Sequence, residues 1–163
     1  MSALKVIEYP NSILSKKAEP VYKLGKEDLR LIQEMIETMY QEDGVGIAAP
    51  QVNVSKRIII VSPRAKRGEE AAYINPEIVE ASPELELGVE GCLSVPGISC
   101  EVWRSRRIKF KALNSKGETV VSEFHDFPAR VIQHEIDHLN GLLIIDRVDF
   151  NQKQSLLSDY KRL

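Results

Sequence analysis

The chain has 163 residues, 43% of them hydrophobic, which is the length of one domain and enough to bury a sizeable core. Its 22 basic and 24 acidic residues give a formal charge of -2, and no lysine or arginine run could follow a phosphate backbone, so direct nucleic-acid binding is not expected. No apolar run approaches the ~20 residues that cross a bilayer, and Lys5 and Glu8 lie where a signal peptide would be apolar. We therefore expect one domain over residues 1–163, located in the cytoplasm and without contact with a membrane.

The N-terminal part of the chain predicts turns and then one amphipathic helix. Residues 4–21 include Tyr9-Pro10, a pair that favours extended segments and turns. Residues 26 to about 41 predict a helix that packs on a core. The apolar residues that recur there at helical spacing are Leu29, Ile32, Met35, Ile36, Met39 and Tyr40.

Small residues follow directly, as GVGIAAPQ at residues 44–51. A phosphate-binding loop is excluded, because no Lys-Ser/Thr follows, the third glycine of a dinucleotide motif is missing, and the run precedes the next strand instead of following one. Small residues do allow the backbone to approach a ligand closely, so a peptide substrate could pair with the backbone near Gly46. The alternative is a plain turn with a buried Ala48-Ala49 pair.

The middle of the chain predicts several strands. Residues 57–62 are rich in isoleucine and valine and predict a strand that is buried on at least one face. Residues 71–74 and 77–81 predict two short strands of alternating character. Asn75-Pro76 is expected to form a turn between them.

An antiparallel hairpin and a helix are predicted next. Apolar and polar residues alternate over residues 108–113 and again over residues 120–124, with a turn at residues 114–117 between them. A helix then begins near Pro128, which suits a first helical turn, and ends near residues 140–141.

The C-terminal region is expected to be extended over residues 142–145 and to form a helix over residues 149–162, with Leu156 and Leu157 facing inward. The order of elements, one helix, several strands and then helices, favours an α+β fold. We expect antiparallel or mixed β-sheets packed around a central metal-binding helix, together with a C-terminal helix.

The strongest chemical signal is QHEIDHLNG at residues 133–141. Residues four apart lie on one face of a helix, so His134 and His138 can present two imidazoles to one metal ion. Glu135 then sits beside the ion, where a carboxylate can take a proton from a polarised water and return it to a leaving group. The alternative is a helix whose histidines only cap or pack.

A catalytic metal site of this kind needs a third protein ligand and an open position for water. One metalloprotease class places a histidine where this chain has Ile144, and another uses a downstream glutamate, but no glutamate follows Glu135. Both classes are excluded. The remaining candidates for the third ligand are Cys92, Cys100, His125, Asp146, Asp149 and Asp159.

Cys92 is preferred, because the adjacent Gly91 lets the backbone bring a thiolate close to an ion. A thiolate and two neutral imidazoles leave a divalent ion with a net charge of about +1, which still acidifies bound water. The alternative of Cys92 as a nucleophile with His134 as its base leaves the rest of the motif without a role. Cys100 is expected to be a small apolar filler, and His125 a surface or capping residue.

Three motifs now stand together: GVGIAAPQ at residues 44–51, EGCLS at residues 90–94 and QHEIDHLNG at residues 133–141. In this order and spacing the chain resembles the peptide deformylase family, whose motifs have the forms G-x-G-x-A-A-x-Q, E-G-C-x-S and H-E-x-D-H. The resemblance covers nearly the whole chain. It implies a metal-dependent hydrolase that removes the N-terminal formyl group from N-formylmethionine of nascent polypeptides and releases formate.

The resemblance also implies roles for single residues. Glu135 would be the general acid and base, and the Gln51 side-chain amide with the Leu93 backbone N–H would bind the developing oxyanion. The metal ligands would be Cys92, His134 and His138. The residues expected to line the peptide cleft and the methionine pocket are Val45, Gly46, Glu90, Gly91 and Val131.

One divalent metal ion is expected per chain. A Cys/His/His set is compatible with iron(II), zinc, nickel and cobalt, and the resemblance points to iron(II) in the cell. The expected partners are an N-formylmethionyl peptide substrate and, transiently, the ribosome. Two other classes stay open: an endopeptidase that uses the same helix, and a non-enzymatic domain whose structural metal has four protein ligands.

Overall fold

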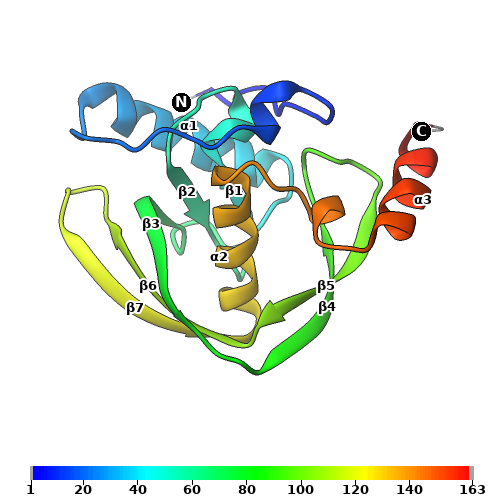
Figure 1. Ribbon diagram of the computed structural model, residues 1–163. Coiled ribbons are helices and arrows are strands. Elements are labelled where there is room, and N and C mark those ends of the chain that lie inside the picture. The colour runs from blue at the N-terminus through cyan, green and yellow to red at the C-terminus, as the bar shows by residue number, and fades with distance from the viewer. Residues whose placement is uncertain (1, 162–163) are drawn as a thin grey trace.

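The computed structural model describes residues 2–161 and shows an α+β arrangement in which two antiparallel sheets surround a central helix, α2 (Figure 1). The helices are α1 (Lys26–Gln41), α2 (Asp126–Leu139) and α3 (Phe150–Lys161), with short 3-10 helices η1 (Ser12–Ser15), η2 (Ala49–Val52) and η3 (Ile144–Asp146). The strands are β1 (Gly46–Ala48), β2 (Ile58–Val61), β3 (Ala71–Ala81), β4 (Leu85–Gly91), β5 (Ser99–Ser105), β6 (Arg107–Leu113) and β7 (Thr119–His125).

The larger sheet has five strands in the order β1-β2-β3-β6-β7, and β4 pairs with β5 in a separate two-stranded sheet. The predicted hairpin is confirmed as β6 and β7, in which Phe110 lies opposite Ser122. Helix α1 has the predicted bounds and buries Ile32, Met35 and Met39. The chain therefore follows the predicted α+β class, with all named strand pairs antiparallel.

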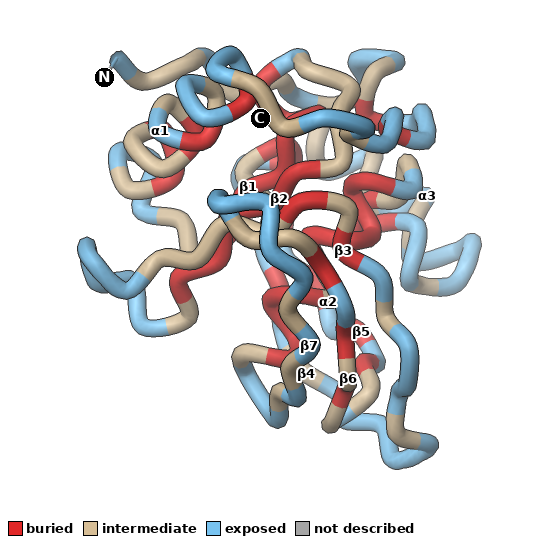
Figure 2. The backbone as a smooth tube through the Cα atoms, turned by 90° about the vertical axis from the view of Figure 1, so that its left-hand side faces the viewer, coloured by how far each residue is buried: buried red, intermediate tan, exposed pale blue. Residues whose placement is uncertain are grey.

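Strand β2 explains why the large sheet needs a helix on each face. Its residues alternate between two hydrophobic clusters, with Ile59 in the cluster under α2 and Ile58 in the cluster under α1. All four residues of β2 are buried, so the strand is covered on both faces and not only on one. Figure 2 shows that buried positions concentrate where β1, β2 and α2 meet.

The predicted turn at Asn75-Pro76 was wrong, because β3 runs without interruption from Ala71 to Ala81. Its pairing with β6 shifts register between Ile74 and Glu77, as in a β-bulge. Asn75 has a positive φ of 52° and its side chain forms two hydrogen bonds with the backbone of Val21, at 2.8 and 2.9 Å. Pro76 lacks an N–H, which a bulge tolerates. The N-terminal segment thus stabilises a bulge where the local sequence favours a turn.

The strands β4 and β5 were not predicted, because β4 has its alternation inside out. Leu85, Leu87 and Val89 point to solvent, and Val89 is 67% exposed. Glu90 points inward and is only 7% exposed. Alternation in a sequence predicts a strand whose apolar residues are buried. In β4 the apolar residues are the exposed ones, so the sequence did not indicate this strand.

The extended segment predicted over residues 142–145 was also wrong, since η3 begins at Ile144. The Asp146 carboxylate accepts a hydrogen bond from the Leu143 N–H at 2.9 Å, which favours a tight turn. The predicted C-terminal helix is confirmed as α3, and its expected end at residue 162 lies outside the described residues. Within residues 2–161, no helix combines the length and the apolar character that a membrane span requires.

Candidate active site

Helix α2 places the two motif histidines on one face. The Nε2 atoms of His134 and His138 lie 3.2 Å apart. The helix ends at Leu139, Asn140 is its C-cap, and Gly141 follows with a φ of +78°. A Cβ on Gly141 would come within 2.6 Å of the Ser15 carbonyl oxygen, so glycine is required there both by its backbone angle and by space.

Cys92 lies just beyond the end of β4 and meets these histidines. Its Sγ is 3.4 Å from the Nε2 of His138, and the ligand atoms of Cys92, His134 and His138 all lie within 4.8 Å of one another. A tetrahedral ion with usual bond lengths holds such donors about 3.4–3.6 Å apart, which is close to the two separations that His138 makes with Cys92 and His134, so the residues fit a metal ion.

The two histidines have different surroundings. The Nδ1–H of His134 donates to Glu90 Oε1 at 2.8 Å, which leaves Nε2 free to bind a metal. The Nδ1 of His138 is buried and has no hydrogen-bond partner among the described residues. Burial and the neighbouring His134 lower the pKa of His138 well below its usual value, so this ring is neutral, the form that binds metals.

Glu135 is 4% exposed and lies against the backbone of β1. A Cβ on Gly46 would approach Glu135 Oε2 to 2.5 Å, so the glycine is needed for this contact. Burial raises the pKa of Glu135 to about 7, a shift that a proton on the neighbouring His134 would oppose. A carboxyl group with a pKa near neutrality is suited to both accepting and donating a proton.

Gln51 reaches the same site from η2. Its Nε2 donates to Ser94 Oγ at 3.1 Å and lies 3.9 Å from Cys92 Sγ. Its Oε1 accepts from the Ala48 N–H at 2.9 Å, which fixes the orientation of the amide. Gln51 is 2% exposed, so its donor group is held in a largely desolvated position.

One cleft of about 1080 Å³ joins these elements. It lies between the N-terminal segment, the turn before β1, the end of β4 and helix α2. His138 is 1% exposed and is not among the residues that line it. The predicted site residues that do line it are Val45, Gly46, Gln51, Glu90, Gly91, Cys92, Leu93, Val131, His134 and Glu135.

Four of the other candidates for the third ligand make contacts away from His134 and His138. Cys100 is buried, and its Sγ is 3.8 Å from the Ile144 carbonyl oxygen, as expected for a filler. His125 is 59% exposed at its side chain. Asp146 pairs with Lys153, and Asp149 accepts a hydrogen bond from the Gln152 N–H at 2.7 Å at the start of α3.

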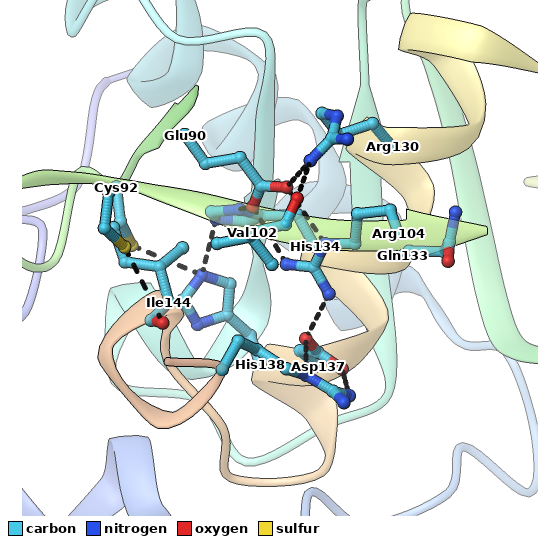
Figure 3. A network of polar contacts seen from close by, with 12 residues as sticks. Glu90, Cys92, Val102, Arg104, Arg130, Gln133, His134, Asp137, His138 and Ile144 are labelled. Atoms are coloured by element: carbon cyan, nitrogen blue, oxygen red, sulfur yellow. Dashed lines mark hydrogen bonds and ion pairs between the residues drawn. The ribbon is translucent and has the colours of Figure 1, made fainter. Parts of the chain in front are cut away.

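A buried charged network beside the histidines was missed from the sequence (Figure 3). Arg104 donates to both carboxylate oxygens of Glu90, at 2.8 and 2.9 Å, and Arg130 donates to Glu90 Oε2 at 2.6 Å. Burial alone would raise the pKa of Glu90, but Arg104 and His134 outweigh it and hold that pKa well below its usual range. Arg104 also donates to Asp137, a residue of the histidine motif to which the sequence assigned no role. No sequence spacing links these residues, so only the fold could reveal them.

Comparisons with known proteins point to one family. The family described as polypeptide deformylase matches residues 3–154. The peptide deformylase of Thermotoga neapolitana is 51% identical over 144 residues, which cover 88% of this chain and 86% of that protein. The peptide deformylase of Thermodesulfovibrio yellowstonii is 40% identical over 163 residues, which cover 99% of this chain and 98% of that protein.

Solved structures agree as well. The crystal structure of peptide deformylase from Thermotoga maritima superposes with a TM-score of 0.87 at 46% identity, and covers 91% of this chain and 99% of that chain. The crystal structure of peptide deformylase from Ehrlichia chaffeensis in complex with actinonin gives a TM-score of 0.92 at 35% identity. The match covers 99% of this chain and 98% of that chain. Family match, identity and fold coincide over nearly the full length, and the chain belongs to the peptide deformylase family of metal-dependent enzymes, which remove the N-formyl group from nascent polypeptides.

Proposed function

We propose that Cys92, His134 and His138 hold one divalent metal ion and that Glu135 is the general acid and base of deformylation. One observation carries the proposal: the three donor atoms lie within 4.8 Å of one another, and Glu135 lines the same cleft as two of these residues, Cys92 and His134. When bound, the ion supplies a Lewis acid that polarises water and the formyl carbonyl.

Glu135 accepts a proton from the attacking water and delivers it to the departing amine of methionine. Its burial keeps the pKa near 7, so both transfers are accessible at neutral pH. Formate and a free amino terminus are the products. Because Gly46 leaves room for the carboxylate, the base can lie flush against β1 without displacing the substrate.

Gln51 and Leu93 stabilise the charge that develops on the formyl oxygen. The Gln51 amide is already oriented by Ala48 and Ser94, and a preorganised donor needs little rearrangement during the reaction. Leu93 follows the proposed ligand Cys92 directly and lines the same cleft, which suits its backbone N–H for this role.

The peptide substrate lies in the cleft with Val45, Gly46, Glu90, Gly91 and Val131 in its wall. Strand β1 is an edge strand of the large sheet, so its backbone near Gly46 is available to pair with an extended peptide. The Glu90 carboxylate is turned toward Arg104 and His134, so Glu90 supports the site and does not contact the peptide through its charge.

The finer features belong to the same proposal. The ion is iron(II) in the cell, and zinc, nickel or cobalt can replace it, because a Cys/His/His set accepts all of these. Residues 1–163 act as one catalytic domain that meets its substrate in the cytoplasm, with transient association with the ribosome.

The direct test is formate release from a formyl-Met tripeptide by metal-loaded protein, followed with a coupled formate assay. We expect turnover on the formylated peptide and none on its unformylated counterpart. A folded, metal-loaded sample that releases no formate contradicts the proposal. Cleavage of internal bonds in unformylated peptides would instead identify an endopeptidase.

A further inference from the structure

A continuous line of charged contacts runs from the C-terminal segment to a proposed metal ligand. Arg147 contacts Asp137, Asp137 contacts Arg104, Arg104 contacts Glu90, and Glu90 contacts His134. Only Arg147 has an appreciably exposed side chain, at 43%, whereas those of Asp137, Arg104 and Glu90 are 9%, 4% and 5% exposed. The chain of contacts therefore has one end at the surface and the other at the site.

The outer contact has the geometry of a two-point clamp. Arg147 Nε donates to Asp137 Oδ2 at 2.9 Å, and Arg147 Nη2 donates to Oδ1 at 2.6 Å. A guanidinium that engages both oxygens of a carboxylate fixes its plane as well as its position. Asp137 lies between His134 and His138 on α2, so its orientation is coupled to the helix face that carries the proposed ligands.

Arg104 is shared between two carboxylates. Its Nη1 donates to Asp137 Oδ2, and its Nε and Nη2 donate to the two oxygens of Glu90. Because Arg147 already satisfies both oxygens of Asp137, Asp137 needs only one donor from Arg104. Removal of Arg147 would leave the Asp137 carboxylate with only the donor from Arg104, which would draw this guanidinium toward Asp137 and away from Glu90.

We propose that Arg147 is a positioning residue for the metal site: through Asp137, Arg104 and Glu90 it holds the His134 ring in the orientation that directs Nε2 at the ion. The inference rests on the ligand set of the proposed function. Arg147 bonds to Asp137 and is not among the described residues that line the cleft, so its effect passes through the shared guanidinium of Arg104. Glu90, which bonds directly to the ring of His134, is the kind of contact whose loss typically changes metal affinity or activity by about 10–100-fold, and Arg147, three contacts farther out, should lie at the lower end of that range.

The test uses the full chain loaded with cobalt(II), whose visible absorption reports the ligands and their geometry. Arg147→Met keeps the aliphatic stem and removes the guanidinium, and Arg147→Lys keeps a charge that can engage one oxygen at a time. Lys153→Met is the matched control, because Lys153 Nζ forms an ion pair of 2.6 Å with Asp146 in the same segment, away from the Asp137 clamp. Cobalt loss to a chelator and thermal unfolding are measured for all variants.

We expect Arg147→Met to alter the cobalt absorption bands and to release cobalt about 10-fold faster, the lower end of the range for such contacts. Arg147→Lys should fall between it and the original protein, and Lys153→Met should match the original protein in both readouts. The inference is wrong if Arg147→Met shows the original spectrum and release rate, or if Lys153→Met changes them equally. Should Arg147→Met fail to fold, Arg147→Lys compared with Lys153→Met decides in the same way.

Two parallel measurements separate this inference from the proposed function. Cys92→Ser should lose the sulfur-to-cobalt absorption band of the original protein; if the original protein lacks that band, the ligand set is wrong and the inference falls with it. Formate release from a formyl-Met tripeptide is followed on the original protein. Failure there overturns the proposed function while the cobalt readouts still decide the role of Arg147.

Discussion

The two sides of helix α2 are built from opposite chemistry. Toward the five-stranded sheet the helix presents Ala129, Ile132, Ile136 and Leu139, which join one hydrophobic cluster with residues of β2 and β6. Toward the β4–β5 sheet it presents Arg130, His134 and Asp137, which join the charged network around Glu90 and Arg104.

The two sides of α2 therefore contribute differently: one stabilises the position of the helix, and the other is suited to orienting its histidine side chains. Apolar burial is strong but not directional, so the sheet side holds the helix in place and tolerates small shifts. Buried ion pairs contribute little net stability, since their attraction mainly offsets the loss of hydration. Their hydrogen bonds are directional, however, so the β4–β5 side is suited to aiming the histidine rings. Substitutions on the two sides should therefore have distinct effects.

The largest effect on activity is expected at Glu135. This residue lies on α2 but belongs neither to the hydrophobic cluster on one side of the helix nor to the charged network on the other. Glu135→Gln keeps the shape of the side chain and removes the acid and base, so kcat for formate release should fall by about 10²–10⁴. Metal content and thermal unfolding should change little, which metal analysis and calorimetry can check. A variant that retains most of its activity would show that another group moves the proton.

The next effect concerns the apolar side. Ile132 is fully buried in the cluster under α2, and Ile132→Ala should lower the free energy of unfolding by about 2–5 kcal/mol, measured by urea titration. The cobalt spectrum of the folded fraction should stay unchanged. Val121→Ala, at a position 55% exposed on β7, is the control and should cost much less. A changed spectrum in Ile132→Ala would mean that the apolar side also aims the ligands.

The charged side should respond in the opposite way. Glu90→Gln weakens the acceptor for His134 and Arg104, and we expect metal affinity to fall about 10–100-fold in a chelator competition. Glu101→Gln, on the exposed face of the neighbouring strand, is the control. Equal metal affinities of the two variants would contradict a role of the network in holding His134.

The smallest effect is expected at an ion pair remote from α2. Burial alone would raise the pKa of Asp28, but hydrogen bonds from Lys56 Nζ at 2.6 Å and from the Gly25 N–H at 2.9 Å lower it overall. A lowered pKa stabilises the native state above the ordinary pKa of aspartate, and this contribution is lost as the pH falls through the lowered value. Lys56→Met should raise that pKa and move the loss to higher pH.

Unfolding free energies between about pH 2 and 7 would test this shift, and at neutral pH the change should stay below ~1 kcal/mol. Lys116→Met, in the exposed turn between β6 and β7, serves as the reference. A pH profile identical to that of the reference would show that Lys56 does not stabilise the Asp28 carboxylate. Such an outcome would leave the contrast between the two sides of α2 intact.

Local patterns alone determined a large part of this protein. Helix α1, the β6–β7 hairpin and helix α2 follow from periodicities and end signals carried within each segment, so the amino-acid order alone places the two histidines and Glu135 on one helix. The three motifs also identified the family. Few residues in the sequence could supply a third metal ligand, and Cys92 is preferred among them because a glycine precedes it.

The tertiary structure decided what depends on partners far along the chain. The bulge at Asn75 depends on hydrogen bonding with the backbone of Val21. Glycine is required at position 46 because the Glu135 side chain, on a helix far along the chain, fills the space that a Cβ would occupy. The inside-out alternation of β4 is stable only because Arg130 of α2 and Arg104 of β5 supply charges for Glu90. A buried carboxylate beside two arginines carries no local signature, since its stability comes from contacts that exist only in the folded state. The sequence thus names the residues proposed to do the chemistry, and the fold brings them together with the buried charged network proposed to orient them.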